Sequence, residues 1–309
     1  MRLGVVRGVT NNSCLLCTIN DILSAISSLG CEAVEIMSHE AEAMEGIDAA
    51  YVMPHVRKLD EHMLGFHVVN SLQSHETSCD KIATTRKLWE FGISTPKTII
   101  TTNYAEISDF VKASGLAVLK WPYGGAGYGH HLMLFDKKIT AINDEGCHEP
   151  KDCEDFIMVG SAVVPKPYYA QEFISYNGTQ SNDRVYRVFV VGNEAKLGVE
   201  RVNENAKRLE DSIINVARGA KYRWMSELPQ EMERIALQTA DAVGFDIGVV
   251  DILSDKNQKF YVIECDCDGR LNIVCRKFKH LEEFCPEKDF DRMIAQRLYD
   301  IASGAKYRF

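Results

Sequence analysis

The stretch KWPYGGAGYG occupies residues 120–129 and restricts the possible folds more than any other part of the sequence. Glycine has no Cβ, so backbone N–H groups in such a stretch can approach phosphate oxygens closely, and Lys120 adds a positive charge beside them. The stretch lacks the Gly-Lys-Ser/Thr of a Walker loop, and a strand-like run follows it where a dinucleotide-binding turn would continue as a helix. A plain glycine-rich hairpin would have the same composition. The stretch therefore indicates a phosphate-binding hairpin if other segments supply matching residues.

Three carboxylate residues form the second group of candidates. Asp251 lies in the apolar run 247–253, and Glu264 and Asp266 lie at the end of the next run, after a polar turn over 254–258. In such a hairpin residues 251 and 264 can lie side by side, and residues 264 and 266 share a face because a strand has a period of two. Three inward carboxylates repel one another unless a divalent cation binds them, and hard oxygen ligands suit magnesium held with nucleotide phosphates. A solvated acidic edge is the alternative, although the flanking residues are too apolar for an exposed strand.

The apolar pattern as a whole predicts an α/β (α+β) protein of three lobes. Residues 1–78 alternate short apolar runs with one amphipathic helix, which is typical of a small α/β lobe with a parallel sheet. Residues 79–165 hold the glycine-rich stretch, and residues 166–309 hold closely spaced strands that favour antiparallel pairing. The expected helices cover residues 19–29, 79–91, 105–113, 230–243 and 288–301. The expected strands cover residues 3–6, 33–36, 49–53, 66–69, 97–101, 116–120, 131–135, 168–174, 184–191, 195–201, 247–253 and 260–264, and the acidic residues 143–155 are expected to form a loop or linker.

The composition argues against several classes of function. The chain has 309 residues and a net charge of −9, so no nucleic-acid partner is expected, because phosphate neutralisation needs clustered Lys and Arg. No apolar run reaches the roughly 20 residues that span a bilayer, and the N-terminus lacks the features of a secretory signal. We therefore expect a cytoplasmic location without a membrane partner, and we leave a homo-oligomer open. The ten cysteines fit free thiols, since the chain shows no route to an oxidising compartment.

A series of further segments completes a recognisable order. They are VNS at 69–71, DK at 80–81, GISTP at 92–96, QEFI at 171–174, RVFVVG at 187–192 with Arg201, and NVARG at 215–219. Together with the glycine-rich stretch and the acidic hairpin, this order resembles the RimK-type branch of the ATP-grasp superfamily. The likeness covers nearly the whole chain from about residue 66 onward.

The resemblance implies an ATP-grasp fold, in which a small N-terminal lobe precedes two α+β lobes that clamp ATP. Lys81 and Lys120 would contact the α- and β-phosphates. The other implied nucleotide-binding residues are Gly124, Gly125, Gly127, Gly129, Gln171, Glu172, Phe173, Ile174 and Asp183. The implied catalytic residues are Arg187, Arg201 and Asn215, and the implied ligands of two Mg²⁺ ions, with Mn²⁺ as an alternative metal, are Asp251, Glu264 and Asp266. Arg187 and Arg201 lie on two strands joined by a tight hairpin, and their even separation can place both side chains on one face.

Three departures from the family pattern stand out. Asp266 occupies the position of a metal ligand that is usually Asn in the family. Val185 stands where the family often has an Asp that contacts the ribose, with Asp183 displaced. The residues after Asp266 lack the usual Ser-Pro-Gly turn, which indicates unusual substrate recognition.

The resemblance implies an ATP-dependent carboxylate-amine ligase. Such an enzyme forms an amide, or peptide-like, bond through an acyl phosphate and releases ADP and phosphate. Its substrates would be the carboxylate of a small molecule or peptide and an amine such as an amino acid. A small-molecule kinase and a non-catalytic ATP-binding regulatory protein stay open as alternatives. The sequence has no His-Arg-Asp or Asp-Phe-Gly segment to support a kinase, and it retains the arginines and carboxylates that a non-catalytic relative would be expected to lose.

Overall fold

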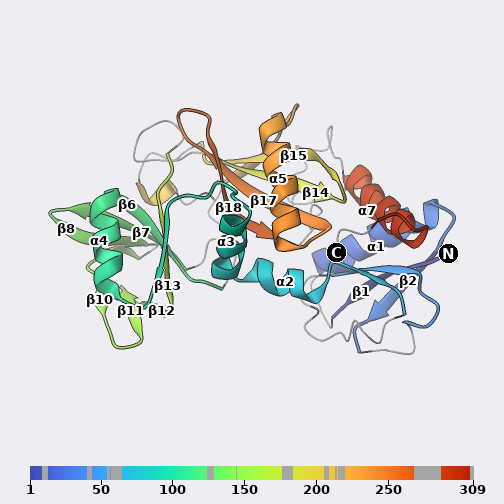
Figure 1. Cartoon of the computed structure of the whole chain (residues 1–309), viewed down its shortest axis with the longest axis horizontal. Helices are drawn as coiled ribbons and strands as arrows, with labels where there is room; N and C mark the ends of the chain where they lie inside the picture. The colour runs from blue at the N-terminus through green and yellow to red at the C-terminus, as the bar shows by residue number, and fades with distance from the viewer. Residues whose placement is uncertain are drawn as a thin grey trace.

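The computed structural model describes residues 1–8, 13–39, 44–53, 56, 65–123, 129–143, 145–175, 184–204, 209–212, 214, 220–267 and 287–306. Figure 1 shows an elongated chain with the N-terminal sheet at one end, the strands around the glycine-rich stretch at the other, and a third sheet between them. The mixed α/β architecture predicted from the sequence is confirmed.

The N-terminal part is a parallel sheet of four strands in the order β2-β1-β3-β4. The strands are β1 (Arg2–Arg7), β2 (Glu32–Met37), β3 (Ala49–Val52) and β4 (His67–Val69). Helix α1 (Ser13–Ser28) connects β1 to β2 and buries Ile19, Ile22 and Ile26. Spacings of three and four residues place these isoleucines on one stripe of the helix. The predicted parallel sheet is confirmed by the pairing of β1 with both β2 and β3.

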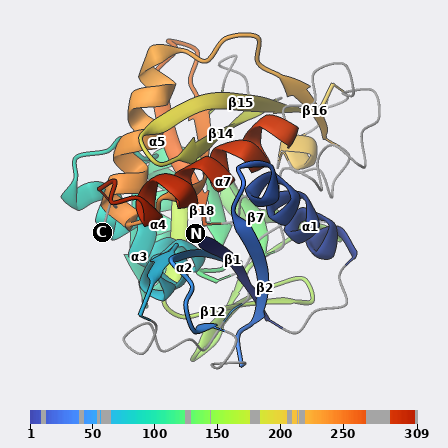
Figure 2. The ribbon, with the colours of Figure 1, turned by 90° about the vertical axis from the view of Figure 1, so that its right-hand side faces the viewer.

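The last helix of the chain returns to this N-terminal part. Helix α7 (Glu287–Ala302) lies beside α1, as the two views in Figures 1 and 2 show. Its residues Phe290, Ile294 and Leu298 are buried in a core shared with α1 and β3. None of the helices in the described ranges has both the length and the apolar composition needed to cross a bilayer.

Two consecutive helices connect the N-terminal part to the rest of the molecule. We expected one helix over 79–91, but α2 (Leu72–Cys79) and α3 (Lys81–Glu90) meet at Asp80. The backbone of Asp80 is extended, and its carboxylate accepts hydrogen bonds from the N–H groups of Ile82 and Ala83. An Asp in this position ends one helix and caps the next, because its side chain satisfies N–H groups that have no partner inside the helix.

The glycine-rich stretch belongs to a six-stranded sheet in the order β5-β13-β6-β7-β8-β9. Its strands are β5 (Thr98–Thr101), β6 (Leu116–Lys120), β7 (His130–Asp136), β8 (Lys138–Asn143), β9 (Gly146–His148) and β13 (Tyr168–Glu172). Helix α4 (Tyr104–Ser114) covers one face through Ile107 and Val111. The sequence groups residues 168–174 with the later strands, whereas β13 pairs with β5 and β6.

A small sheet of three strands lies next to the six-stranded sheet. It consists of β10 (Lys151–Asp152), β11 (Phe156–Val159) and β12 (Ala162–Pro165). The expectation of a loop or linker over 143–155 is therefore wrong in part, because β9 and β10 lie in that range. Each of these strands has only two or three residues, which is too short for a period of two to be visible in the sequence.

The third sheet is antiparallel and has the order β16-β15-β14-β17-β18. Its strands are β14 (Arg184–Val191), β15 (Glu194–Val202), β16 (Lys221–Trp224), β17 (Ile247–Ser254) and β18 (Phe260–Asp266), with the short helix η3 (Leu209–Ser212) before β16. Helix α5 (Gln230–Val243) packs against one face, where Val188, Val250 and Ile252 are buried. The opposite face carries Phe189, Val199 and Val249, which join the core beneath α7.

This second face of the sheet positions the candidate site. Two residues beyond Phe189, Val199 and Val249 along the same strands stand Arg187, Arg201 and Asp251. Because side chains two positions apart in a strand point to the same face, the charged residues continue the surface on which the core residues lie. The apolar end of this face packs against the N-terminal part, and the charged end carries the residues of the candidate site.

The base of β17 is fixed by two polar side chains from distant segments. Asn70, which is buried, accepts hydrogen bonds from the N–H groups of Asp246 and Ile247 and donates to the carbonyl of Ile247 at 2.6 Å. Arg297 of α7 donates to both carboxylate oxygens of Asp246, at 2.6 and 3.1 Å. The strand that carries Asp251 is therefore anchored from both the N-terminal part and the last helix.

Candidate active site

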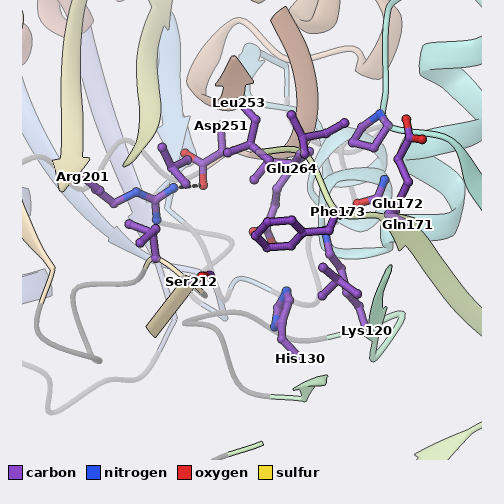
Figure 3. A pocket seen from close by; sticks show the side chains of 16 residues that line it. Lys120, His130, Gln171, Glu172, Phe173, Arg201, Ser212, Asp251, Leu253 and Glu264 are labelled. Carbon is purple, nitrogen blue, oxygen red and sulfur yellow. Dashed lines mark hydrogen bonds and ion pairs between the residues drawn. The ribbon is translucent and has the colours of Figure 1, made fainter. Parts of the chain in front are cut away.

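A pocket lies between the six-stranded and the five-stranded sheet (Figure 3). One wall comes from β6, β7 and β13 and the residues after β13, and the other comes from β14, β15, β17 and β18. The lining residues are Pro96, Val118, Lys120, His130, Gln171, Glu172, Phe173, Ile174, Val185, Arg201, Ser212, Ile214, Asp251, Leu253, Ile263 and Glu264. Eight of the residues that the sequence analysis singles out are in this set: Lys120, Gln171, Glu172, Phe173, Ile174, Arg201, Asp251 and Glu264.

Asp251 is held by Arg187 and Arg201, the two arginines that the family resemblance implies as catalytic residues. Arg187 Nε donates to Asp251 Oδ1 at 2.8 Å and its Nη2 to Oδ2 at 3.0 Å, while Arg201 Nη2 lies 2.5 Å from Oδ2. The predicted convergence of the two arginines on one face is thus observed. Burial by itself would raise the pKa of Asp251, but the charges of Arg187 and Arg201 lower it to about 2. Asp251 is therefore an anion at neutral pH.

Glu264 faces Asp251 across the hairpin and pairs with another cation. The two residues are register partners in β17 and β18, as the sequence predicts. A β-bulge follows Asp251 in this pairing, so Ile263 and Glu264 both line the pocket although they are consecutive. Lys81, the first residue of α3, places its Nζ 3.0 Å from Glu264 Oε1 and is almost completely buried.

Two of the three predicted metal ligands, Asp251 and Glu264, contact protein cations in this structure. Within the described ranges, no three His, Cys, Asp or Glu side chains come together in a way that could hold a metal ion. Asp266 pairs with Val249, two positions farther from the turn of the hairpin than the pair of Asp251 and Glu264. The chemistry of the donor set nevertheless fits magnesium, because hard carboxylate oxygens stand at facing positions of neighbouring strands. Magnesium bound there would take over part of the neutralisation of these carboxylates, which Lys81, Arg187 and Arg201 supply in its absence.

Lys120 stands on the opposite wall from Arg201. It ends β6, is buried, and donates to Gln171 Oε1 at 2.5 Å. Burial lowers the pKa of Lys120 to about 8, with Glu264 acting in the opposite direction and Lys81 in the same direction. A buried ammonium beside an amide oxygen can bind an anion strongly, because the anion compensates the ammonium for the water that it has lost.

The segment expected to hold adenine leaves β13 at the edge of the pocket. Glu172 uses its side chain within the protein, accepting a hydrogen bond from the N–H group of Lys97 at 3.0 Å. The N–H group of Phe173 donates to the carbonyl of Leu116, and its ring lies in the pocket (Figure 3). Apolar side chains face this region from both sheets: Val118, Ile174, Val185, Leu253 and Ile263. A flat aromatic ring system fits such a slot.

Several predicted residues lie outside the described ranges: Gly124, Gly125, Gly127, Asp183 and Asn215. Gly129, at the end of the glycine-rich stretch, is described. Its φ of +70° and the closeness of the Trp121 ring, which a Cβ at this position would meet at 2.5 Å, both require glycine. Its carbonyl accepts a hydrogen bond from the N–H group of Trp121, which closes the stem of the hairpin.

Sequence reasoning missed several residues of the pocket. Val118 and Leu253 lie two positions from Lys120 and Asp251, so the period of two along each strand was a sufficient signal for them. His130 is the cross-strand partner of Lys120, and only the register of β6 and β7 reveals it. Ser212 belongs to the short helix η3, and no local pattern indicates that it reaches the pocket.

Comparison with known proteins agrees with this geometry. Residues 78–280 match the RimK-like ATP-grasp domain. The chain belongs to the RimK-like ATP-grasp family. It is 29% identical over 202 residues to the alpha-aminoadipate–LysW ligase LysX of Saccharolobus solfataricus, a match that covers 65% of this chain and 66% of the relative. It is also 25% identical over 204 residues to the coenzyme gamma-F420-2:alpha-L-glutamate ligase of Methanococcus maripaludis, covering 65% of this chain and 62% of the relative.

Solved structures of ATP-grasp ligases share the fold of this chain over almost its whole length. A RiPP-associated ATP-grasp ligase of Chryseobacterium gregarium superimposes with a TM-score of 0.64 at 15% identity, covering 99% of this chain and 98% of that one. At this identity the likeness shows the fold alone. This likeness confirms the ATP-grasp fold expected from the sequence. The match to the family confirms the RimK type, and the relatives named above are ligases.

Proposed function

We propose that this protein uses ATP to activate a carboxylate as an acyl phosphate and then joins it to an amine, releasing ADP and phosphate. The observation that carries the proposal is the pocket between the two sheets, where Lys120 stands on one wall and Arg201, Asp251 and Glu264 on the other. The buried cations Lys120 and Arg201 line this pocket, and buried Lys81 contacts Glu264 there. Phosphoryl transfer needs such cations.

The residues divide between the nucleotide and the reacting group. Lys81 and Lys120 would hold the α- and β-phosphates, and the apolar slot beside Phe173 would take the adenine. Arg187 and Arg201 would stabilise the charge that spreads over the transferred phosphoryl oxygens, because a carboxylate that attacks the γ-phosphate brings two anions together. This role requires the arginines to share their contacts between Asp251 and the incoming phosphate.

Carboxylates of the site would bind magnesium. ATP-grasp proteins bind ATP with Mg²⁺, and we assign Asp251, Glu264 and Asp266 as its ligands, with two ions and Mn²⁺ as an alternative. The metal would supply a charge that neutralises the phosphate oxygens. Asp266 in place of the usual Asn adds a negative charge to the donor set, which favours tighter metal binding.

The substrates are a carboxylate on a small molecule or peptide and an amine such as an amino acid. The names of the relatives pair alpha-aminoadipate with LysW in one case and L-glutamate with coenzyme gamma-F420-2 in the other, which supports an amino acid as one of the two substrates. The amine must attack as a free base, so the rate should rise with pH until the amine is mostly deprotonated. A cytoplasmic location remains our prediction from the sequence.

The test follows a carboxylate oxygen. A screen of amino acids and small acids for ADP release identifies an active pair, and the acid of that pair is then labelled with oxygen-18 in its carboxylate. Mass analysis should find the label in the released phosphate. Products AMP and pyrophosphate, or phosphate without label, would refute the acyl-phosphate mechanism, and ATP binding without turnover on any acid and amine would favour the non-catalytic alternative.

A further inference from the structure

Gln171 takes part in a chain of hydrogen bonds that has only one possible direction. The hydroxyl of Thr98 donates its proton to the carbonyl of Pro96 at 2.8 Å, so its oxygen acts as the acceptor for Gln171 Nε2 at 3.1 Å. This contact orients the side-chain amide and leaves Oε1 facing Lys120 Nζ at 2.5 Å. A flipped amide would place two donors, the amide NH₂ and the ammonium, against each other.

Both partners of the final contact are buried. Gln171 is 2% exposed and Lys120 is 6% exposed, so water has little access to this hydrogen bond. Lys120 also lies over the ring of Tyr169, 6.0 Å from its centroid, and the Tyr169 hydroxyl is itself tied to Thr85 of α3 at 2.9 Å. The lysine side chain, which has four rotatable bonds and high entropy when free, is therefore held in one position before any ligand arrives.

We infer that Gln171 is a positioning residue for ATP binding, which fixes Lys120 so that its remaining N–H donors point into the nucleotide pocket. This inference rests on the proposed function, in which Lys120 contacts the ATP phosphates. It assigns to Gln171 a role through Lys120, in addition to its place next to the segment expected to hold adenine. An ammonium has three donors, and the contact with Gln171 uses one, which leaves two for phosphate oxygens.

A neutral amide suits this role better than a carboxylate or an apolar side chain. A glutamate at 171 would pair with Lys120 and compete with the phosphates for its charge. A methionine of similar length would leave the buried ammonium without an acceptor and free to change its rotamer. The amide oxygen satisfies one donor and leaves the full positive charge for the nucleotide.

The decisive experiment is a double-mutant cycle on ATP affinity, measured by calorimetry on the full chain without other substrates. The variants are Gln171→Met, Lys120→Met and the double variant. We expect Gln171→Met to weaken ATP binding about tenfold in the wild-type background and less than about twofold when Lys120 is already Met, because a residue that acts through Lys120 has no effect without it. Gln238→Met is the matched control, since Gln238 Oε1 also accepts from a cation, Arg234 Nη1 at 2.7 Å, but on the exposed surface of α5.

A second readout uses the pH dependence of the same affinity. The charged or titratable groups around Lys120 are Glu264, Lys81 and Asp251, with Tyr169 beneath it and His130 opposite it in the sheet. Gln171→Glu keeps the shape of the side chain and adds a negative charge, so the loss of ATP affinity at high pH should move to higher pH, whereas Gln171→Met should move it to lower pH. A purely structural role would not shift the two variants in opposite directions.

The outcomes separate the inference from the proposed function. If Lys120→Met leaves ATP affinity unchanged, the nucleotide site itself is wrong. If Lys120→Met weakens binding but Gln171→Met has an equal effect in both backgrounds, and the pH profiles of the two Gln171 variants coincide, the positioning role is overturned and the ATP site stands.

Discussion

Replacing Asp251 with Asn tests the charge arrangement at the centre of the site. Asp251 has a side chain that is 3% exposed and contacts two guanidinium groups, of which Arg201 is 7% exposed and Arg187 is 24% exposed. Asn keeps the shape of the side chain and removes its charge. The two arginines then lie on either side of a neutral amide, and the buried guanidinium of Arg201 has little water to solvate its charge.

The size of the effect can be bounded from two directions. The pKa of Asp251 is about 2 rather than 3.8, and this difference of about 1.8 corresponds to about 2.4 kcal/mol in favour of the charged form. Removing one partner of a buried ion pair typically costs about 3–5 kcal/mol, because it leaves an uncompensated charge. We therefore expect Asp251→Asn to lower the free energy of unfolding by about 2–4 kcal/mol at pH 7.

Urea denaturation of the full chain measures this loss, and Asp109→Asn provides the control. Asp109 pairs with Lys112 at 2.9 Å, within 0.1 Å of the 2.8 and 3.0 Å contacts between Asp251 and Arg187, but both side chains are exposed, so its loss should stay below about 0.5 kcal/mol. Because the folded state lowers the pKa of Asp251, its stabilisation is present above about pH 4 and is lost as the pH falls towards 2. The difference between wild type and Asp251→Asn should shrink accordingly in acid. An Asp251→Asn variant as stable as Asp109→Asn at pH 7 would refute the reasoning.

Three further predictions address other parts of the molecule. Glu264→Gln should remove most ADP release and leave the fold intact, because a metal ligand loses the charge that offsets magnesium; turnover near the wild-type level at saturating magnesium would contradict the metal assignment. Lys120→Ala should raise the KM for ATP and lower kcat. In the wild type, ATP affinity should fall as the pH rises above about 8, because burial brings the pKa of Lys120 to that value and only the charged form attracts phosphate. An ATP affinity that stays constant between about pH 7 and 10 in calorimetry would argue against a phosphate contact of this lysine. Arg297→Met should lower the free energy of unfolding by about 3 kcal/mol in urea denaturation, because Asp246 is completely buried and its carboxylate would lose its partner; an unchanged midpoint would show that this ion pair does not anchor β17.

Local patterns in the sequence were sufficient for much of the site. The alternation of apolar residues in 247–253 and the polar turn after it predicted that Asp251 and Glu264 face each other, and the register of β17 and β18 confirms this. The even separation of Arg187 and Arg201 across a tight hairpin predicted that they share a face, and both contact Asp251. These inferences succeeded because a short hairpin fixes its own register and a strand has a strict period of two.

The tertiary structure decided what depends on contacts between distant segments. The pairing of β14 with β17 joins residues about 60 apart in the chain and brings both arginines to one carboxylate. The position of β13 between β5 and β6, and the return of α7 to the N-terminal helix α1, also have no local signature. The same is true of the contact between Gln171 and Lys120, which requires the register of β6 and β13. Periodicity tells which face of a strand is apolar, but the partner that covers the face is chosen by packing of the whole chain, since many partners could bury the same apolar area.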